Sequence, residues 1–500
     1  MSNYNQLINK AKTFYNSNQF NNAKGCLLEL LEKYKLDTKI KSKIYLLLAD
    51  VLNKTNSFKY VEEYLLKYLE INPSDSTALN LIANNFSKIR RYEAAEKYYK
   101  KSIKFDKNSE TAIINLAILL ENLGRNLDSI NFYNKALSIN PNNLGVIYNM
   151  SKLDKKIVDE KKIDLIKKII SLKNVDYFNI AAGYFLLANL DYEKKDVNKE
   201  IFFLEQANNF SFKHKEKINM QALNYWLNII PKKFNKLIYK KNGNDTDYKN
   251  FYPIFVIGLP RSGSTLTETI ISSGKNKIQD LGETNLINWS LLNNYREDLF
   301  KNSDENFTIN IDINKIADKL ISSYDNLDVP INDKKVFLLD KSLENFYYVD
   351  LILKIFPNAK FIHTYRNLED NIFAIYKEFL SQISWSHSLK DIIKYINNYL
   401  KVMDIQKNKN KDCILSVSLE ELTNNPEKIS KKIYNFCNLD WDESCLNFQK
   451  RKNLFSKTAS NNQIRSGIKK YNTNKYGPYY YLLKDYKKNF DWIKLHSDKS

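Results

Sequence analysis

A glycine-rich turn at residues 258–265, GLPRSGST, follows an apolar run and precedes a segment of helical character. Its spacing fits the phosphate-binding pattern G-x-x-x-x-G-K-[ST], except that Ser264 stands in place of the lysine. Backbone N–H groups at the start of a helix bind anions, so we expect the turn to hold a phosphate. Without the lysine that bridges the β- and γ-phosphates, and with Arg261 earlier in the turn, a phosphate ester carrying a transferable group is favoured over a nucleoside triphosphate. An ordinary strand-to-helix turn is the alternative.

Charged residues also follow two of the other apolar runs. Lys341 comes directly after KVFLLD, so a strand there would place its ammonium group at the carboxyl end of a sheet. Arg366 ends AKFIHTYR, and its planar guanidinium suits a phosphate dianion. His363 lies within the same run, where side chains alternate, so we expect a packed histidine rather than a base. An exposed ion pair between Asp340 and Lys341 is the non-functional alternative.

A sheet is needed to bring these residues together. Apolar runs bounded by turn residues predict strands, and the amphipathic segments between them predict helices. Strands that alternate with helices imply an α/β domain with a central parallel sheet, whose ligands lie at the carboxyl ends of the strands. The predicted strands are 251–258, 277–283, 335–341 and 359–366, and the predicted helices are 265–274 and 345–356.

The preceding part of the chain repeats with a period of 34 residues. Segments that end at Pro73, Lys107 and Pro141 are evenly spaced, since 107 − 73 = 34 and 141 − 107 = 34. Small residues recur where helices would cross, and large residues recur where they would fill the groove between units. The paired positions are Ala83 and Ala117, Phe86 and Leu120, and Ser102 and Ala136. This pattern is typical of tetratricopeptide repeats, which stack into an all-α solenoid that binds a peptide or partner, or serves structure alone.

Further helical pairs extend this solenoid on both sides. They lie at about 4–35, 43–70 and 183–210. The polar stretch YKKNGNDTDYKN has the composition of a linker. The predicted domains are a tetratricopeptide solenoid over 1–238, a linker over 239–250 and an α/β domain of the P-loop type over 251–500.

Four blocks of the α/β segment resemble the sulfotransferases that use 3′-phosphoadenosine-5′-phosphosulfate (PAPS). The resemblance covers about 253–480 and the repeats before them, and it extends to bacterial tetratricopeptide-repeat sulfotransferases and to the related tyrosylprotein sulfotransferases. The blocks are PRSGST (260–265), DLGE (280–283), LLDKSLENFYYVDLILKIFPNAKFIHTYRN (338–367) and KTASNNQIRSGIKKYNTNKY (457–476). Four blocks in this order are far more specific than any one of them alone.

The resemblance implies roles at the reacting end of the donor. Glu283 would be the general base that takes the proton from an acceptor hydroxyl, and Lys341 would contact the sulfuryl oxygens. Arg261 and Lys341 would stabilise the charge that develops during transfer, a contribution of about 3–4 kcal/mol for a well-placed donor. These cations would neutralise the charge without a metal ion. The residues implied to hold the 5′-phosphosulfate are Arg261, Ser262, Gly263, Ser264 and Thr265.

The resemblance also implies a site for the rest of the donor, with two departures from the family pattern. Arg366 would bind the 3′-phosphate, Ser460 would meet the cofactor phosphate, and Lys475 would lie near the cofactor. The family serine eight residues after the arginine is Ala374 here, since 366 + 8 = 374, so one hydrogen bond to the 3′-phosphate is missing. Tyr476 stands where the family has tryptophan, which changes the aromatic surface beside the cofactor.

Composition limits the remaining possibilities. With 43% hydrophobic and 27% charged residues the chain is globular, and no apolar stretch approaches the roughly 20 residues of a membrane span. The net charge of +20 suits an anionic nucleotide or acidic substrate. The codon bias of an AT-rich genome, which favours lysine, also contributes to this charge. No nucleic-acid recognition module is visible. Four scattered cysteines form no disulfide or zinc pattern, Cys437 and Cys445 are expected to be buried, and a cytoplasmic location is expected.

These observations predict a PAPS-dependent sulfotransferase whose acceptor carries a hydroxyl or an amine. A protein tyrosine, a glycan and a small molecule all remain candidates. The repeats would present the acceptor, bind a protein partner or support self-association. One alternative is a repeat scaffold whose C-terminal domain binds nucleotide weakly without turnover, and another is a P-loop kinase, which the absence of the lysine disfavours.

Overall fold

The computed structural model describes residues 3–17, 19–241, 248, 250–301, 308–330, 335–451, 454–456, 458, 460–473 and 475–493. The chain divides into two compact units. Unit 1 is Met1–Pro141 with Ile321–Ile331, and unit 2 is Asn142–Leu320 with Asn332–Ser500. Most of the predicted linker at 239–250 lies outside the described residues, so the domain limits at 238 and 251 stay predictions. Among the described residues, no helix has the length and apolar character needed to cross a membrane.

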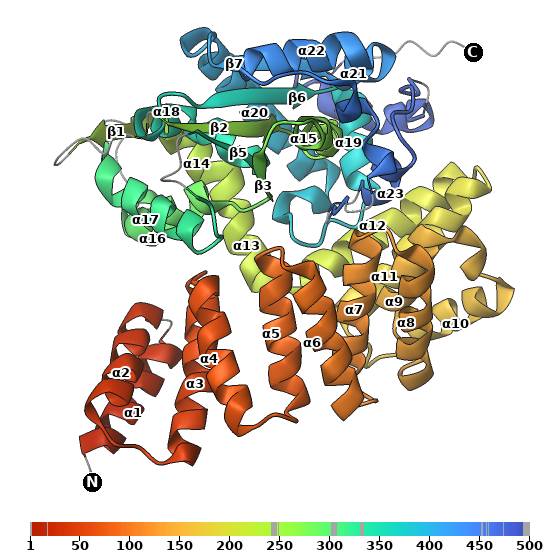
Figure 1. Ribbon diagram of the computed structural model, residues 1–500. Coiled ribbons are helices and arrows are strands. Elements are labelled where there is room, and N and C mark those ends of the chain that lie inside the picture. Colours follow the sequence, from red (N-terminus) through yellow and green to blue (C-terminus); the bar gives the residue numbers. More distant parts are fainter. Residues whose placement is uncertain are drawn as a thin grey trace. The chain divides into compact units, whose positions relative to one another are not determined.

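Unit 1 is built from antiparallel helical pairs, drawn in red to orange in Figure 1. Each pair is joined by a short turn, and apolar residues line the surface between its helices. The helices are α1 (Asn3–Asn16), α2 (Phe20–Lys33), α3 (Thr38–Lys54), α4 (Phe58–Ile71), α5 (Ser76–Lys88), α6 (Tyr92–Phe105), α7 (Glu110–Asn122) and α8 (Asn126–Ile139).

The turns within these pairs carry the period of 34 residues. Asn56, Arg90 and Gly124 all have positive φ, and 90 − 56 = 34 and 124 − 90 = 34. A left-handed residue just after a helix is a common way to end it and to reverse the chain. The predicted repeat is therefore confirmed at the level of the backbone.

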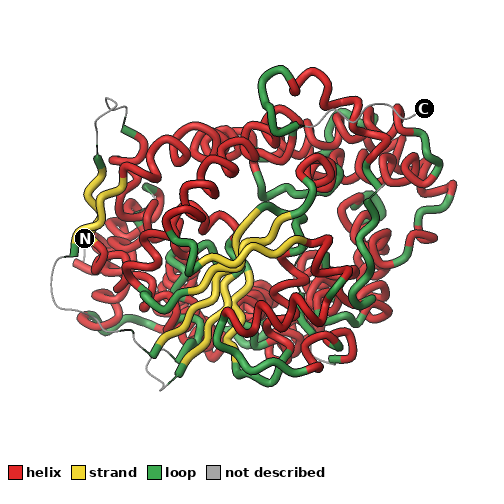
Figure 2. The backbone as a smooth tube through the Cα atoms, turned by 90° about the horizontal axis from the view of Figure 1, so that it is seen from above, coloured by secondary structure: helices red, strands yellow, loops and turns green. Residues whose placement is uncertain are grey.

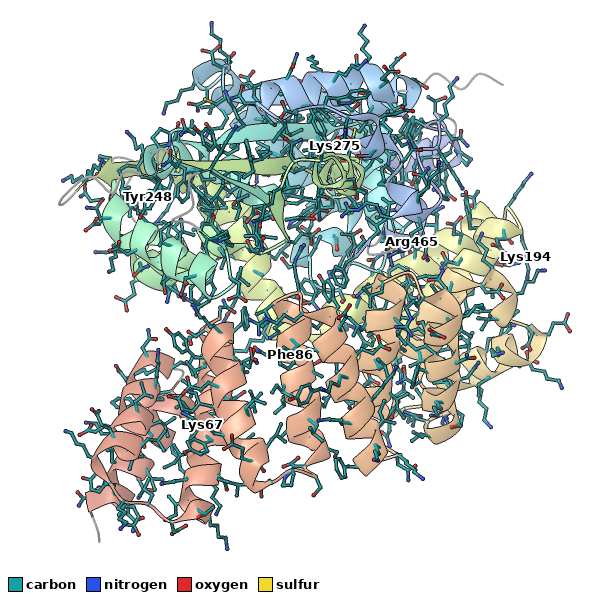
Figure 3. The ribbon with its side chains drawn as sticks, viewed as in Figure 1. Lys67, Phe86, Lys194, Tyr248, Lys275 and Arg465 are labelled. Atoms are coloured by element: carbon teal, nitrogen blue, oxygen red, sulfur yellow. The ribbon has the colours of Figure 1, made fainter. Side chains whose placement is uncertain are left out.

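The small and large positions predicted from the sequence form the core of the repeats. Phe86, labelled in Figure 3, is buried and packs its ring against Tyr98 of the same pair, with 5.3 Å between ring centroids. The small positions allow two helices to approach closely because nothing larger than a methyl or hydroxymethyl group separates them. The buried small residues are Ala83, Ala117, Ser102 and Ala136.

Unit 2 begins with further helices and continues into the α/β part. The predicted helical pair at 183–210 is present as α11 and α12. Phe379, from the α/β part, stacks on Phe185 of α11 with 4.8 Å between ring centroids, so these helices and the α/β part share a core. The helices are α9 (Leu144–Leu153), α10 (Glu160–Ile170), α11 (Tyr177–Glu193), α12 (Val197–His214), α13 (Glu216–Asn224) and α14 (Ile230–Lys233).

The centre of unit 2 is a five-stranded parallel sheet with the strand order β3-β5-β2-β6-β7. Its strands run side by side in Figure 2, where they are yellow. They are β2 (Phe251–Gly258), β3 (Ile278–Gly282), β5 (Val336–Asp340), β6 (Lys360–Tyr365) and β7 (Ile414–Ser418). A separate parallel pair joins β1 (Leu237–Lys240) to β4 (Ile309–Asp312). The four predicted strands of the parallel sheet are confirmed, whereas β1, β4 and β7 were not predicted.

Helices cover both faces of the sheet, which explains why its strands are almost continuously apolar. Because side chains alternate along a strand, Ile254 and Val256 face a core shared with α15 and α22. The opposite face includes His363, which contacts Tyr399 of α20. The remaining helices are α15 (Ser264–Ser273), α16 (Leu286–Phe300), α17 (Ile313–Asp325), α18 (Val349–Ile355), α19 (Leu368–Tyr376), α20 (Leu389–Lys409), α21 (Leu419–Asn424), α22 (Pro426–Phe436), α23 (Asn461–Arg465) and α24 (Lys484–Lys487).

Candidate active site

The predicted site residues lie at one edge of the sheet. Since the five strands are parallel, their carboxyl ends meet at the same edge, and four of them are followed by predicted site residues. Glu283 follows β3, Lys341 follows β5, and Arg366 follows β6. The glycine-rich turn leaves β2, which lies between β5 and β6 in the sheet. The strand order therefore sets the sequence of charges along the edge.

Two glycines give the turn its shape. Gly258 has φ of 139°, and a Cβ atom there would meet the carbonyl oxygen of Thr364 at 2.3 Å. Gly263, the N-cap of α15, has φ of 92°, and a Cβ atom would lie 2.7 Å from Cδ1 of Leu419. Arg261 between them is also left-handed, with φ of 64°. The turn thus packs tightly against the next strand and presents the N-terminus of α15 at the sheet edge.

The hydroxyl groups of the turn divide into two sets. Ser262 is buried, and its Oγ donates to the carbonyl oxygen of Leu259 at 2.7 Å and lies 2.8 Å from Oγ1 of Thr364. Its hydroxyl therefore stabilises the turn itself. Thr265, at the start of α15, donates from Oγ1 to Oγ1 of Thr458 at 3.2 Å. Thr265 thus joins the turn to the C-terminal block.

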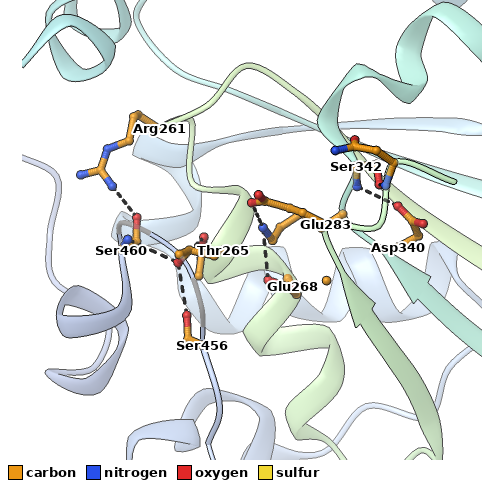
Figure 4. Close-up of polar contacts among 12 residues, drawn as sticks. Arg261, Thr265, Glu268, Glu283, Asp340, Ser342, Ser456 and Ser460 are labelled. Carbon is orange, nitrogen blue, oxygen red and sulfur yellow. Dashed lines mark hydrogen bonds and ion pairs between the residues drawn. The ribbon is translucent and has the colours of Figure 1, made fainter. Parts of the chain in front are cut away.

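Arg261 is the cation of the turn, and Figure 4 shows it reaching toward the C-terminal block. Its Nη1 donates to Oγ of Ser460 at 2.8 Å, and its Nη2 lies 3.5 Å from Oε2 of Glu378. Its Nε is buried and has no hydrogen-bond partner among the described residues. A buried guanidinium N–H without an acceptor is costly, so this position is suited to an anion.

Arg366 has a similar environment one strand away. Its Nη1 donates to the carbonyl oxygen of Arg261 at 3.1 Å, and its Nη2 donates to the hydroxyl of Tyr471 at 2.5 Å. The guanidinium lies over the rings of Tyr471 and Tyr476, at 4.8 and 5.4 Å from their centroids. Asp370 is 3.7 Å away, and the Nε of Arg366 is also buried without a partner among the described residues. This second unpaired donor is the observation that best fits a phosphate.

Lys341 and Glu283 form an ion pair at the other end of the edge. The Lys341 Nζ donates to Oε1 of Glu283, and Oε2 of Glu268 lies 3.7 Å from the same nitrogen (Figure 4). Burial lowers the pKa of Lys341, but the nearby carboxylates of Glu268, Glu283 and Asp280 outweigh this effect and raise the pKa above its ordinary value. Lys341 is therefore a charged lysine inside the protein, which is the state needed to neutralise an anion.

A hydrogen-bonded carboxylate fixes the backbone around this pair. Asp340 is fully buried, and its side chain accepts from the backbone N–H of Ser342 at 2.7 Å and from Oγ1 of Thr284 at 2.6 Å. Burial raises the pKa of Asp340, and these hydrogen bonds act against the increase. The carboxylate thus links the segments after β3 and β5, which carry Glu283 and Lys341. The predicted alternative of an exposed Asp340–Lys341 pair is wrong, because both side chains are buried.

The other predicted residues occupy different surroundings. Lys475 is exposed beside Tyr476, with its Nζ 5.2 Å from the ring centroid. Ala374 is buried within α19. His363 is packed as predicted: it contacts Ser416 and Tyr399, and burial lowers its pKa to about 3. The predicted burial of the two C-terminal cysteines is confirmed as well.

Four polar residues of this edge were not predicted from the sequence. Glu268 lies four residues beyond the predicted site residue Ser264 in the same helix, so helical periodicity could have placed them on the same side, and Asp370 lies four residues beyond Arg366. Glu378 and Tyr471 reach their arginine partners from segments 117 and 105 residues away, as 378 − 261 and 471 − 366 show. No local pattern could reveal these two.

Fold and site together define an α/β domain of the P-loop type with an arginine-bearing turn that suits an anion. Residues 253–443 match the family described as "Sulfotransferase family". Residues 76–109 and 111–143 match the family described as "Tetratricopeptide repeat". The chain therefore contains tetratricopeptide repeats followed by a sulfotransferase family domain, as predicted.

Similar proteins were found among curated sequences and solved structures. An uncharacterized protein of Aquifex aeolicus (strain VF5) is 28% identical over 337 residues, 65% of this chain, and the matched part spans only 43% of that relative. The sulfotransferase domain of the Synechococcus PCC 7002 olefin synthase is 18% identical, with a TM-score of 0.31, over 46% of this chain and 88% of that one. YrrB, a tetratricopeptide-repeat protein with a peptide-binding site, is 16% identical, with a TM-score of 0.28, over 35% and 89%.

Proposed function

We propose that the protein transfers a sulfuryl group from PAPS to a hydroxyl or amine acceptor. The observation that best supports this proposal is that the Nε groups of Arg261 and Arg366 are buried and lack a hydrogen-bond partner among the described residues. Both belong to side chains at the carboxyl edge of the sheet, where ligands of α/β proteins bind. An anionic ligand with two separate phosphate groups would satisfy both donors, and the sulfate donor of this family has that character.

The residues of the edge have distinct tasks in this proposal. The turn of Arg261, Ser262, Gly263, Ser264 and Thr265 would hold the 5′-phosphosulfate through main-chain N–H groups, hydroxyls and the guanidinium. Since the hydroxyl of Ser262 is bonded within the turn, that residue would contribute its main chain. Arg366 would hold the 3′-phosphate, Ser460, bonded to Arg261, would meet a phosphate of the cofactor, and Lys475 would lie near the cofactor.

The reaction itself needs a base and a cation next to the acceptor. When bound, PAPS supplies an activated sulfuryl group: a new S–O (or S–N) bond forms to the acceptor, and the bond from sulfur to the 5′-phosphate oxygen breaks to release 3′,5′-adenosine bisphosphate. Glu283 takes the proton that the acceptor loses. Lys341 and Arg261 neutralise the negative charge at the site, a contribution that depends on their being positioned before reaction.

The proposal extends to the acceptor and to the role of the repeats. A peptide tyrosine, a glycan hydroxyl and a small molecule all suit the pair of Glu283 and Lys341. The repeats at 76–143 would present the acceptor or bind a protein partner, as solenoids of this kind commonly do.

The first experiment measures the melting temperature of the full chain with 3′,5′-adenosine bisphosphate and, separately, with ATP and Mg²⁺. A ligand that binds only the folded state stabilises it by about 2.7 kcal/mol at a concentration of 100 Kd. We expect the bisphosphate to raise the melting temperature and ATP with Mg²⁺ to leave it unchanged. The opposite result would overturn the proposal and favour a kinase.

The second experiment measures sulfate transfer from labelled PAPS to a panel of tyrosine peptides, glycans and phenols. Glu283→Gln should lower the rate of transfer by roughly 10²–10⁴-fold, the usual contribution of a general base. Glu427→Gln is the matched control, because Glu427 forms an exposed ion pair with Lys431 at 2.6 Å. Equal rates in Glu283→Gln and the wild type would show that the base is assigned wrongly.

One observation favours a second candidate, a repeat scaffold that binds the nucleotide weakly and does not turn it over. Ala374 offers no hydroxyl where the family pattern has serine, and it is buried in α19 beside the segment that carries Arg366. Binding of the bisphosphate with no transfer to any acceptor in the panel would favour this candidate.

A further inference from the structure

The buried ammonium group of Lys341 has two carboxylate partners of different character. The side chain of Lys341 is 1% exposed, that of Glu283 is 56% exposed, and that of Glu268 is 10% exposed. Glu283 therefore meets the lysine from the solvent side, where an acceptor arrives. Glu268 meets it from within the protein, on the helix that follows the donor turn (Figure 4).

The proposed reaction disturbs this arrangement. When Glu283 takes a proton it becomes neutral and can no longer compensate the charge of Lys341. An ammonium group that loses its partner inside a protein is strongly disfavoured, because burial has already removed its water. The lysine must nevertheless stay charged at that moment, since the site is then stabilising negative charge.

We propose that Glu268 is a positioning residue that keeps Lys341 charged and in place while Glu283 accepts the proton. This inference rests on the proposed function. Glu268 suits the task because its Oε2 lies 3.7 Å from Nζ of Lys341, and because it is shielded from any acceptor that reaches Glu283. No covalent change occurs at Glu268, which acts through the lysine alone.

Other acidic groups around Lys341 do not replace Glu268. Asp340 already accepts hydrogen bonds from Ser342 and Thr284, and burial raises its pKa. Burial also raises the pKa of Glu344 to about 7, so that it is only partly ionised near neutral pH. The charged groups that influence Lys341 are Glu268, Glu283, Asp280, Asp340 and Glu344. Among the described residues, only Glu268 and Glu283 form ion pairs with its Nζ within 4 Å.

The first arm of the test does not depend on activity. We would compare the melting temperatures of the wild type, Glu268→Gln, Glu283→Gln and the double variant at pH 7. Each single change leaves one carboxylate on the ammonium group, whereas the double change removes both. We expect the double variant to lose more than the sum of the two single losses. Additive losses would overturn the inference, because they would mean that the two carboxylates do not share Lys341.

The second arm separates positioning from binding. In Glu268→Gln we expect kcat for sulfate transfer to fall at least tenfold, while the melting-temperature shift with 3′,5′-adenosine bisphosphate stays within error of the wild type. The loss of kcat should deepen as pH rises from about 7 to 9. Without the carboxylate of Glu268, burial lowers the pKa of Lys341, so that a rise in pH removes its proton. Glu268→Asp should recover part of the rate, and Glu427→Gln should match the wild type throughout.

The outcomes of the two arms are distinguishable. A Glu268→Gln variant with wild-type kcat and pH profile would overturn the inference even if the wild type is an active sulfotransferase. If the wild type neither binds the bisphosphate nor transfers sulfate, the proposed function fails and the inference fails with it. In that case, non-additive losses of melting temperature would still show that the two carboxylates share Lys341. The error would then lie in the proposed function and not in the pairing of Glu268 with Lys341.

Discussion

Arg366→Lys should weaken the binding of 3′,5′-adenosine bisphosphate by roughly 10- to 150-fold. The substitution keeps the positive charge and removes the planar fork, so it tests the geometry of the site rather than its charge. The Nε of Arg366 is a buried donor without a partner among the described residues, and lysine has no equivalent of it. A hydrogen bond to a charged group contributes about 1.5–3 kcal/mol, and each 1.4 kcal/mol is a tenfold change in Kd, which gives the range above.

The affinity would be measured by isothermal titration calorimetry on the full chain. Arg451→Lys is the matched control, because Arg451 is exposed and donates to the carbonyl oxygen of Ser272 at 2.9 Å in the same unit. Its Kd for the bisphosphate should equal that of the wild type. Because Tyr471 keeps its hydrogen bond to Asp370, we expect Arg366→Lys to stay folded, which its melting temperature checks. A folded Arg366→Lys variant with an unchanged Kd would refute the assignment of the 3′-phosphate site.

Two further predictions concern stability. Gly263→Ala should lower the free energy of unfolding, measured in urea, by about 1–3 kcal/mol. The reason is that φ at this position is 92° and the new Cβ would lie 2.7 Å from Cδ1 of Leu419. Gly477→Ala is the control and should change the free energy of unfolding little, because a Cβ there would have nothing within 4 Å. His363 is neutral in the folded protein, with its pKa lowered by burial from 6.5 to about 3, so the unfolded state binds the extra proton and stability falls as pH drops through this window. In His363→Gln the free energy of unfolding should fall less steeply with decreasing pH, by about 1.4 kcal/mol per pH unit, as measured by unfolding at several acid pH values. An equal dependence on pH in the variant and the wild type would contradict this.

The sequence predicted the sheet edge well because the rule behind it is local. An apolar run that ends in a polar residue predicts a strand end, and parallel strands bring their carboxyl ends together. Glu283, Lys341 and Arg366 each follow such a run and lie at this edge in the structure. The fold class and the repeats were predicted for the same reason, since apolar runs, amphipathic segments and a period of 34 residues are visible without knowledge of distant contacts.

Strands outside the recognised blocks were missed for a related reason. β7 (Ile414–Ser418) has the sequence ILSVS, in which two polar serines interrupt a short apolar run. Its backbone pairs with β6 in parallel register, and that contact, rather than the composition of the segment, makes it a strand. β1 and β4 have four residues each, and 68 residues lie between the end of one and the beginning of the other, since 309 − 240 − 1 = 68. Such a pair carries no local signal.

The partners of the site cations show what a sequence cannot supply. Each cation has a buried or half-buried carboxylate at 3.5–3.7 Å, close enough to offset the charge but too far for a well-formed hydrogen bond. These pairs are Arg261 with Glu378, Lys341 with Glu268, and Arg366 with Asp370. The arrangement stabilises two buried cations and the largely buried Arg261, and within the described part of the chain it still leaves both guanidinium Nε groups without acceptors. A site that exists only to hold the fold together would have used those donors, so the loose pairing is itself an argument that an anionic ligand completes this edge.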